Sequence, residues 1–242
     1  MIDRITPTFR PNQSARGYQR WRSLLFLHWP VPVETLQPLL PSGLEVDHYD
    51  GVAYVGVVPF AMEGVRNAWW PKWAAMTFLE TNVRTYVYHG SQPGVYFLSL
   101  DAANRLAVWG ARWFWGLPYY HAEMSLVRTG NEIAYETSRP GGNARHHVQY
   151  RIGPELGPSQ PGTLEHFFLE RYLLFLEHRG ALYSGQVHHV PYPAHDVELM
   201  EIEDSLANAS GLMIPPGPPA FAHFSPGVDV EVFGLRPLNR GS

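Results

Sequence analysis

Glycine and proline divide this chain into short segments. Its 242 residues include 22 of each, and the runs between them are rich in β-branched and aromatic residues, which is typical of strands. The turn sequences Tyr49-Asp50-Gly51 and Thr129-Gly130-Asn131 predict antiparallel connections. We expect strands over residues 44–48, 52–60, 78–89, 95–100, 119–129, 132–138, 144–152, 182–190, 197–202 and 228–233.

A few segments have the pattern of helices instead. The clearest begins after Thr163 and ends before Gly180, and Asp101 is placed to cap a second one. We expect helices over residues 33–40, 102–115 and 164–179 and a minor turn over 205–210. Many strands and few helices predict an α+β fold that is mainly β, an antiparallel β-barrel with helices packed outside it or across its ends. No repeat, low-complexity tract or charge block marks a linker, so we expect one domain over residues 1–242.

Charge and cysteine content exclude several classes of function. The chain has 18 basic and 22 acidic residues and a net charge of −4, so we expect no nucleic-acid partner. It has no cysteine, which excludes disulfides, thiolate catalysis and cysteine metal ligands. The longest apolar run, over residues 52–62, is far shorter than the ~20 residues of a spanning helix. Residues 1–17 lack the apolar segment of a secretory signal, so we expect a cytoplasmic protein without a membrane partner.

Lysine is almost absent from the basic residues. Seventeen of the 18 are arginine, and Lys72 is the single lysine. Arginine keeps its proton and cannot act as an amine nucleophile. Any Schiff-base chemistry must therefore use Lys72 or the α-amino group. Lys72 lies in the aromatic segment Trp69-Trp70-Pro71-Lys72-Trp73, which is also a candidate surface patch for a protein partner.

The expected strand over residues 78–89 has one polar face. If it is regular, the side chains on that face are Glu80, Asn82, Arg84, Tyr86 and Tyr88. The face either meets solvent, with Glu80 and Arg84 as a weak surface pair, or lies inside a barrel and lines a pocket for a small polar ligand. In the second case burial tunes the Glu80 carboxylate for proton transfer.

A second cluster follows the expected helix at residues 102–115. Tyr119 and His121 share one face of the next strand, and Tyr120 lies on the other. These residues are either core aromatics with one satisfied histidine, or acid/base and hydrogen-bonding groups beside Glu80. Arg112, just before them, is placed to hold a carboxylate in a bidentate contact.

The twelve histidines suggest a metal site, but their spacing argues against one. The dense positions are adjacent pairs such as His146-His147 and His188-His189, and neighbouring strand residues point to opposite faces. His-Glu-x-x-His, phosphate-binding loop, Gly-x-Ser-x-Gly and Gly-x-Gly-x-x-Gly motifs are absent. We expect no metal and no cofactor.

Seven segments together resemble one family, DUF2071, also called YqjF-like. They are residues 26–32, 39–45, 78–87, 94–101, 117–120, 170–172 and 223–228, and they span nearly the whole chain. The family resembles acetoacetate decarboxylase in fold, which implies a β-barrel or cone around a small-molecule site. The resemblance places Glu80 where that superfamily has a pocket carboxylate, and it raises the expectation of a homo-oligomer.

The same resemblance argues against the decarboxylase mechanism. The decarboxylases use a Gly-x-Pro-Lys-Lys stretch whose first lysine forms the Schiff base. Here the matching stretch is Gly116-Leu117-Pro118-Tyr119-Tyr120, and phenols cannot form an iminium.

These observations predict a pocket that takes a small carbonyl or carboxylate compound and performs acid/base chemistry of the lyase or hydratase type. The expected proton acceptor is Glu80, with Asn82 and an arginine binding the substrate. The candidate donors are Tyr119, Tyr120 and His121, and the candidate anion clamps are Arg84 and Arg112. Two alternatives stay open, a binding protein on the same barrel and an interaction scaffold that uses the tryptophan segment.

Overall fold

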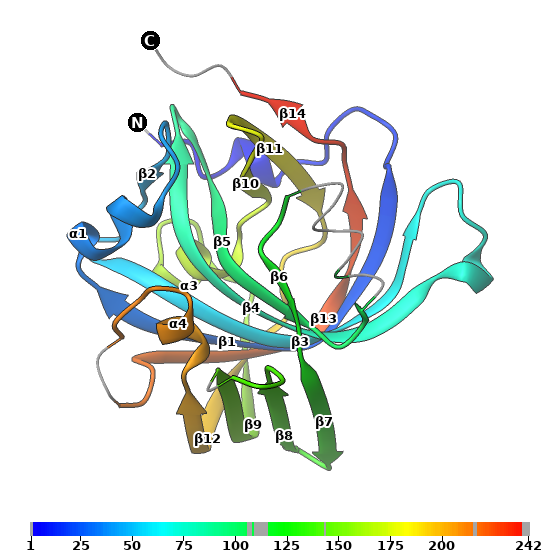
Figure 1. The fold of residues 1–242 in the computed structure, drawn as a ribbon, viewed down its shortest axis with the longest axis vertical. Helices are drawn as coiled ribbons and strands as arrows, with labels where there is room; N and C mark the ends of the chain where they lie inside the picture. Colours follow the sequence, from blue (N-terminus) through cyan, green and yellow to red (C-terminus); the bar gives the residue numbers. More distant parts are fainter. Residues whose placement is uncertain (1, 106–107, 109–115, 143, 215–216, 239–242) are drawn as a thin grey trace.

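The computed structural model describes residues 2–105, 108, 116–142, 144–214 and 217–238 (Figure 1). Most of these residues lie in strands. The strands are β1 Gly17–Val31, β2 Glu45–Val46, β3 Ala53–Asn67, β4 Met76–His89, β5 Gln92–Ala102, β6 Tyr119–His121, β7 Glu123–Thr129, β8 Glu132–Ser138, β9 Arg145–Gly157, β10 Leu173–His178, β11 Ala181–His188, β12 Ala194–Asp204, β13 Phe221–Val232 and β14 Arg236–Pro237. The helices are α1 Val33–Leu36, α3 Leu164–Leu169 and α4 Leu206–Ala209, with 3-10 turns at Thr6–Thr8, Gln37–Leu39 and Lys72–Ala74.

Seven strands close into a cone-like ring within the described part of the chain. Their order is β13, β1, β3, β4, β5, β10 and β11, and β11 pairs with β13 to close it. The ring surrounds an apolar core to which every one of its strands contributes a buried or partly buried side chain. This confirms the mainly β, cone-like fold, although the pairing of β10 with β5 is parallel rather than antiparallel.

A second layer continues from the ring. The outer edge of β13 pairs with β12 near Phe224, and β9, β8 and β7 follow in order. These strands form the lower part of the molecule in Figure 1. A second apolar core, with side chains from β1, β3, β4, β8 and β9, lies between the ring and this layer. The walls of the ring are therefore buried on both faces at β3 and β4.

The helix expected over residues 164–179 is wrong after its first turns. Thr163 does cap a helix, since its side chain accepts a hydrogen bond from the His166 amide, but α3 ends at Leu169. Residues Leu173–His178 instead form β10, between β5 and β11. An apolar run fits either period, and here the backbone groups of β10 pair along the whole strand with β11 and at Leu174 and Phe175 with β5.

Two further expectations differ from the structure. Asp101 and Ala102 lie in β5, so Asp101 is no helix cap; the rest of the predicted helix falls largely outside the described residues. The strand β1 was not expected, although it joins β3 and β13 at the centre of the sheet. Of the two turn signals, Thr129-Gly130-Asn131 does connect an antiparallel pair, β7 and β8. The other makes only the bridge Tyr49–Val52, because β2 pairs with β4.

No helix in the described ranges is long and apolar enough to cross a membrane.

The antiparallel pairing of β1 with β13 depends on a glycine. Gly227 has a φ of +131°, and a Cβ atom there would lie 2.1 Å from the Trp21 carbonyl oxygen. The pairing of β1 with its other neighbour, β3, has a register shift at the same level, between Arg22 and Leu27. The two features let β1 bend into the ring while it keeps its pairing with β13.

We predict that Gly227→Ala destabilises the fold by at least ~1–3 kcal/mol, because strain and a backbone clash act together. Gly217→Ala is the matched control, since Gly217 has a φ of +133° but no atom within 4 Å of its added Cβ. Urea unfolding of both variants measures the difference. Equal losses in the two variants would contradict a role for the Trp21 contact.

Candidate functional site

One face of β4 points into the ring. Its register with β3 is unbroken from Leu79 to Thr85, so side chains alternate strictly between the two cores. Glu80 and Asn82 are 2% and 5% exposed, and the interpretation of this face as a surface is therefore wrong. The outer layer fixes β4 at this level, because the hydroxyl of Tyr135 lies 3.0 Å from the Glu80 carbonyl oxygen.

Tyr119 contacts Glu80 inside the ring. β6 pairs in parallel with β5 and places Tyr119 beside Leu100. The Tyr119 hydroxyl donates a hydrogen bond of 2.8 Å to Glu80 Oε2, and the Asn82 side chain also hydrogen-bonds the Glu80 carboxyl group. Glu80, Asn82 and Tyr119 therefore form one cluster from two separate strands.

Burial controls the protonation of this cluster. Removal from water raises the pKa of Glu80 to about 8, and the hydrogen bond from Tyr119 partly opposes that rise. Burial likewise raises the pKa of Tyr119 well above its ordinary value. Near neutral pH both groups therefore hold their protons for most of the time. Glu80 rests as a carboxylic acid, whereas the sequence suggested a proton acceptor.

Arg84 lies in the same interior but farther along β4. Its terminal nitrogen donates to the Phe168 carbonyl oxygen at 3.3 Å and lies 3.4 Å from the Tyr86 hydroxyl. Its Nε atom is buried and has no hydrogen-bond partner. No acidic residue within the described ranges forms an ion pair with it.

Two other predicted site residues, Tyr120 and His121, are not among the buried side chains of the described residues. Tyr120 is 39% exposed, and its ring lies 3.8 Å from the Arg139 guanidinium on the outer face. His121 is half-buried at the end of β6, opposite Ala102. Arg112 lies outside the described residues.

Two histidines lie in the interior of the ring, although the sequence did not predict them there. His28 stacks on Phe168 with ring centroids 3.8 Å apart, and its Nε2 lies 2.6 Å from the Tyr86 hydroxyl. His189 stacks on Tyr172 at 4.5 Å. Desolvation lowers the pKa of His28 well below its ordinary value and that of His189 to about 4, so both rings are neutral. Strand parity would have placed His28 inside, had β1 been predicted.

Lys72 lies outside this interior site, although it is only eight residues before Glu80 in the sequence. It is exposed in the 3-10 turn at the end of the β3–β4 hairpin, which projects from the ring in Figure 1. Trp69 and Trp73 in the same segment are 81% and 86% exposed. The described residues contain no group of three metal-ligating side chains.

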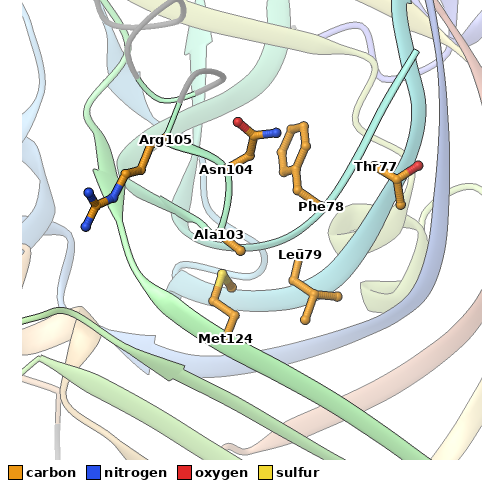
Figure 2. A pocket seen from close by; sticks show the side chains of 7 residues that line it. All are labelled: Thr77, Phe78, Leu79, Ala103, Asn104, Arg105 and Met124. Carbon is orange, nitrogen blue, oxygen red and sulfur yellow. The ribbon is translucent and has the colours of Figure 1, made fainter. Parts of the chain in front are cut away.

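Figure 2 shows an open cleft of about 550 Å³ beside the ring. It lies between the start of β4, the residues after β5 and Met124 of β7. Phe78 lines it and belongs to the interior core, two residues before Glu80. The cleft therefore reaches the ring wall next to the cluster, without including Glu80 itself.

We predict that Glu80→Gln removes a specific pH dependence of stability. Between about pH 4.5, the ordinary pKa, and about pH 8, the folded wild-type protein keeps the Glu80 proton, whereas the unfolded chain has released it. The stability that this proton supplies is complete below about pH 4.5 and is lost as the pH rises to about 8, by up to ~1.4 kcal/mol per pH unit.

Urea unfolding of wild type and variant from about pH 5 to about pH 8 tests this prediction. As the pH rises, the unfolding free energy of the wild type should fall relative to that of Glu80→Gln. Contributions from the histidines cancel because both proteins share them. Parallel stability curves would show that Glu80 ionises at its ordinary pKa.

Comparison with known proteins agrees with this architecture. Residues 18–229 match DUF2071, described as an uncharacterized conserved protein. Uncharacterized protein YqjF of Bacillus subtilis (strain 168) is 37% identical over 220 residues, which cover 90% of each chain. Among solved structures, the enduracididine biosynthesis enzyme MppR complexed with pyruvate has a TM-score of 0.69 at 13% identity, over 96% of this chain and 93% of that one.

A second solved structure extends the likeness of fold. Acetoacetate decarboxylase from Legionella pneumophila has a TM-score of 0.62 at 14% identity, over 97% of this chain and 92% of that one. At such identities the similarity concerns the fold. The family match and the relative that is 37% identical establish more: the chain belongs to the DUF2071 family.

Proposed function

We propose that the interior of the ring binds a small carbonyl or carboxylate compound and that Glu80 exchanges protons with it. The observation that carries this proposal is the buried hydrogen bond of 2.8 Å between Tyr119 and Glu80. A carboxyl group whose pKa is raised to about 8 is matched to proton transfer near neutral pH. A carboxyl group whose pKa is raised this far by burial, beside a specific hydrogen-bond partner, is a candidate for a functional site.

Glu80 would begin the reaction as the acid. In an elimination of the hydratase type, its proton passes to the leaving hydroxyl group, which departs as water. The resulting carboxylate then removes a proton from the neighbouring carbon, a double bond forms between the two carbons, and Glu80 is again protonated. Throughout, Tyr119 keeps its own proton and donates a hydrogen bond that stabilises the carboxylate form.

Two observations favour this chemistry over a Schiff base. The single lysine is exposed on a projecting hairpin, and the resemblance to the decarboxylase motif implies that Tyr119 and Tyr120 stand where the decarboxylases have lysines. The similar fold of MppR, solved with pyruvate, supports a small carbonyl acid as the class of ligand.

The alternative is a binding protein that performs no chemistry. The observation that favours it is the mutual satisfaction of Glu80 and Tyr119, which already bond to each other. A ligand would then stabilise the fold without being converted.

A panel of short keto acids, hydroxy acids and their enoate products, followed by thermal shift and turnover, tests the function. We expect turnover of at least one compound, and a loss of ~10²–10⁴ in kcat/KM for Glu80→Gln. Tyr119→Phe should lower kcat more than it raises KM.

Glu45→Gln is the matched control, since Glu45, like Glu80, accepts a hydrogen bond from a tyrosine. Its partner is Tyr88 of β4, and the pair lies outside the ring. The control variant should keep full activity. Stabilisation by ligands without any product would support the binding protein instead.

We also predict that borohydride reduction in the presence of these carbonyl compounds yields no covalent adduct at Lys72. Intact-mass measurement of wild type and Lys72→Ala checks it. A reduced adduct that disappears in Lys72→Ala and accompanies loss of activity would overturn the non-covalent mechanism.

A further inference from the structure

Arg84 is a cation without a counter-ion in the described part of the chain. Its Cζ atom lies 5.4 Å from the Phe26 ring centroid and 5.7 Å from that of Tyr86, inside the ring. Its strongest described contact is the Phe168 carbonyl oxygen at 3.3 Å, and the buried Nε–H group has no acceptor. Arg84 as a whole is half-buried, but its Nε–H group is shielded from water, and a shielded charged donor without an acceptor is costly to desolvate. The geometry therefore leaves a position for an anion.

His189 presents a complementary atom in the same region. It is 3% exposed and is packed between Tyr172 and Tyr192. Its Nδ1 lies 2.7 Å from the Val190 carbonyl oxygen and must carry the ring proton, so Nε2 is left with a free lone pair. That buried Nε2 atom has no partner. It is an acceptor for a hydroxyl group.

Two packed aromatic rings connect Arg84 with His189. The Arg84 Cζ atom lies over the Phe26 ring, the Phe26 and Tyr192 ring centroids are 5.2 Å apart, and those of Tyr192 and His189 are 4.6 Å apart. The positive charge of Arg84 is among the causes that lower the pKa of His189, after burial, and it also acts on the Tyr192 hydroxyl in the same core. The two unpaired atoms thus belong to one part of the interior.

This region is separated from Glu80 along the strand. Glu80 and Arg84 share a face of β4 but lie four residues apart, which is about 13 Å between their backbones. Arg84 leans toward Tyr86, away from Glu80, while Glu80 is held by Tyr119. Asn82 lies between them, and its buried Oδ1 has no partner. The face is therefore a row with an acid at one end, an acceptor in the middle and a cation at the other end.

We propose that this row binds an elongated carboxylic acid, with its carboxylate at Arg84, a hydroxyl on the adjacent carbon at His189 and its reacting end, a carbonyl or a second hydroxyl group, at Glu80 and Tyr119. A three-carbon keto acid is too short to reach both ends at once. The Glu80 end of this assignment rests on the proposed function; the Arg84 end stands on its own contacts.

Isothermal titration with defined probes tests the assignment. Pyruvate and 6-oxoheptanoate compare chain length, and heptan-2-one replaces the carboxylate of 6-oxoheptanoate with a methyl group. In wild type we expect 6-oxoheptanoate to bind at least about tenfold more tightly than either of the others. Arg84→Gln should remove its advantage over heptan-2-one, and Arg84→Lys should keep part of it.

Two further variants sharpen the result. Arg66→Gln is the control, because Arg66 is half-buried against Tyr18 at the start of β1, and it should leave all affinities unchanged. His189→Phe keeps the stacked ring but removes the acceptor, so it should abolish any gain in affinity from 6-oxoheptanoate to 2-hydroxy-6-oxoheptanoate.

Tightest binding of pyruvate, or equal affinities of 6-oxoheptanoate for wild type and both Arg84 variants, would overturn the proposal. Its failure is separable from that of the proposed function, because affinity is measured without turnover. Binding that depends on Arg84 without product formation supports this subsite and contradicts the acid/base chemistry. Turnover that depends on Glu80 but not on Arg84 does the reverse.

Discussion

The exclusion of water from Glu80 is the constraint on which the interior of this protein depends. A carboxylate in an apolar enclosure is costly, and the group responds by holding its proton until about pH 8. The ring supplies the enclosure because β11 returns to β13 and leaves no open edge between them. Tyr119 moderates the effect, since its hydrogen bond favours the ionised form while the surrounding core disfavours it. A carboxyl group with a pKa of about 8 therefore follows from the fold itself.

The same enclosure explains why the polar groups are arranged along one strand. The outer layer packs against β4, where Val83 lies in the second core and Leu79 packs against it. The residues that alternate with these face the ring interior, where Glu80, Asn82 and Arg84 succeed one another at strand spacing. Unpaired donors and acceptors within a buried row of this kind are normally completed by a ligand or by water. Tyr119 stabilises the acid end of the row through its hydrogen bond to Glu80, whereas Tyr120 lies outside the ring against Arg139.

Much of this was predictable from residue order, and the exceptions have physical causes. Alternation along β4 placed Glu80, Asn82 and Arg84 on one face because the strand has no bulge against β3. Residues 173–178 were expected to be helical because a short apolar run carries no distinctive period, although the strand forms a hairpin with β11, which follows it directly in sequence. The strand β1 was not predicted for a related reason. Its buried half is apolar on both faces, so it lacks the alternation of a half-buried strand. Without β1, His28 had no predicted position, and the contact of Tyr120 with Arg139 depended on a pairing that no local signal reveals.

The protonation state of Glu80 is the most direct test of this account. Isotope-edited infrared spectroscopy of glutamate-labelled protein, with Glu80→Gln as the reference, resolves the carboxylic-acid carbonyl band of this one residue. The account predicts that the band is present at pH 7 and disappears with a midpoint near pH 8. A Glu80 that is already fully ionised at pH 6 would contradict it, because the interior of the ring would then be open to water.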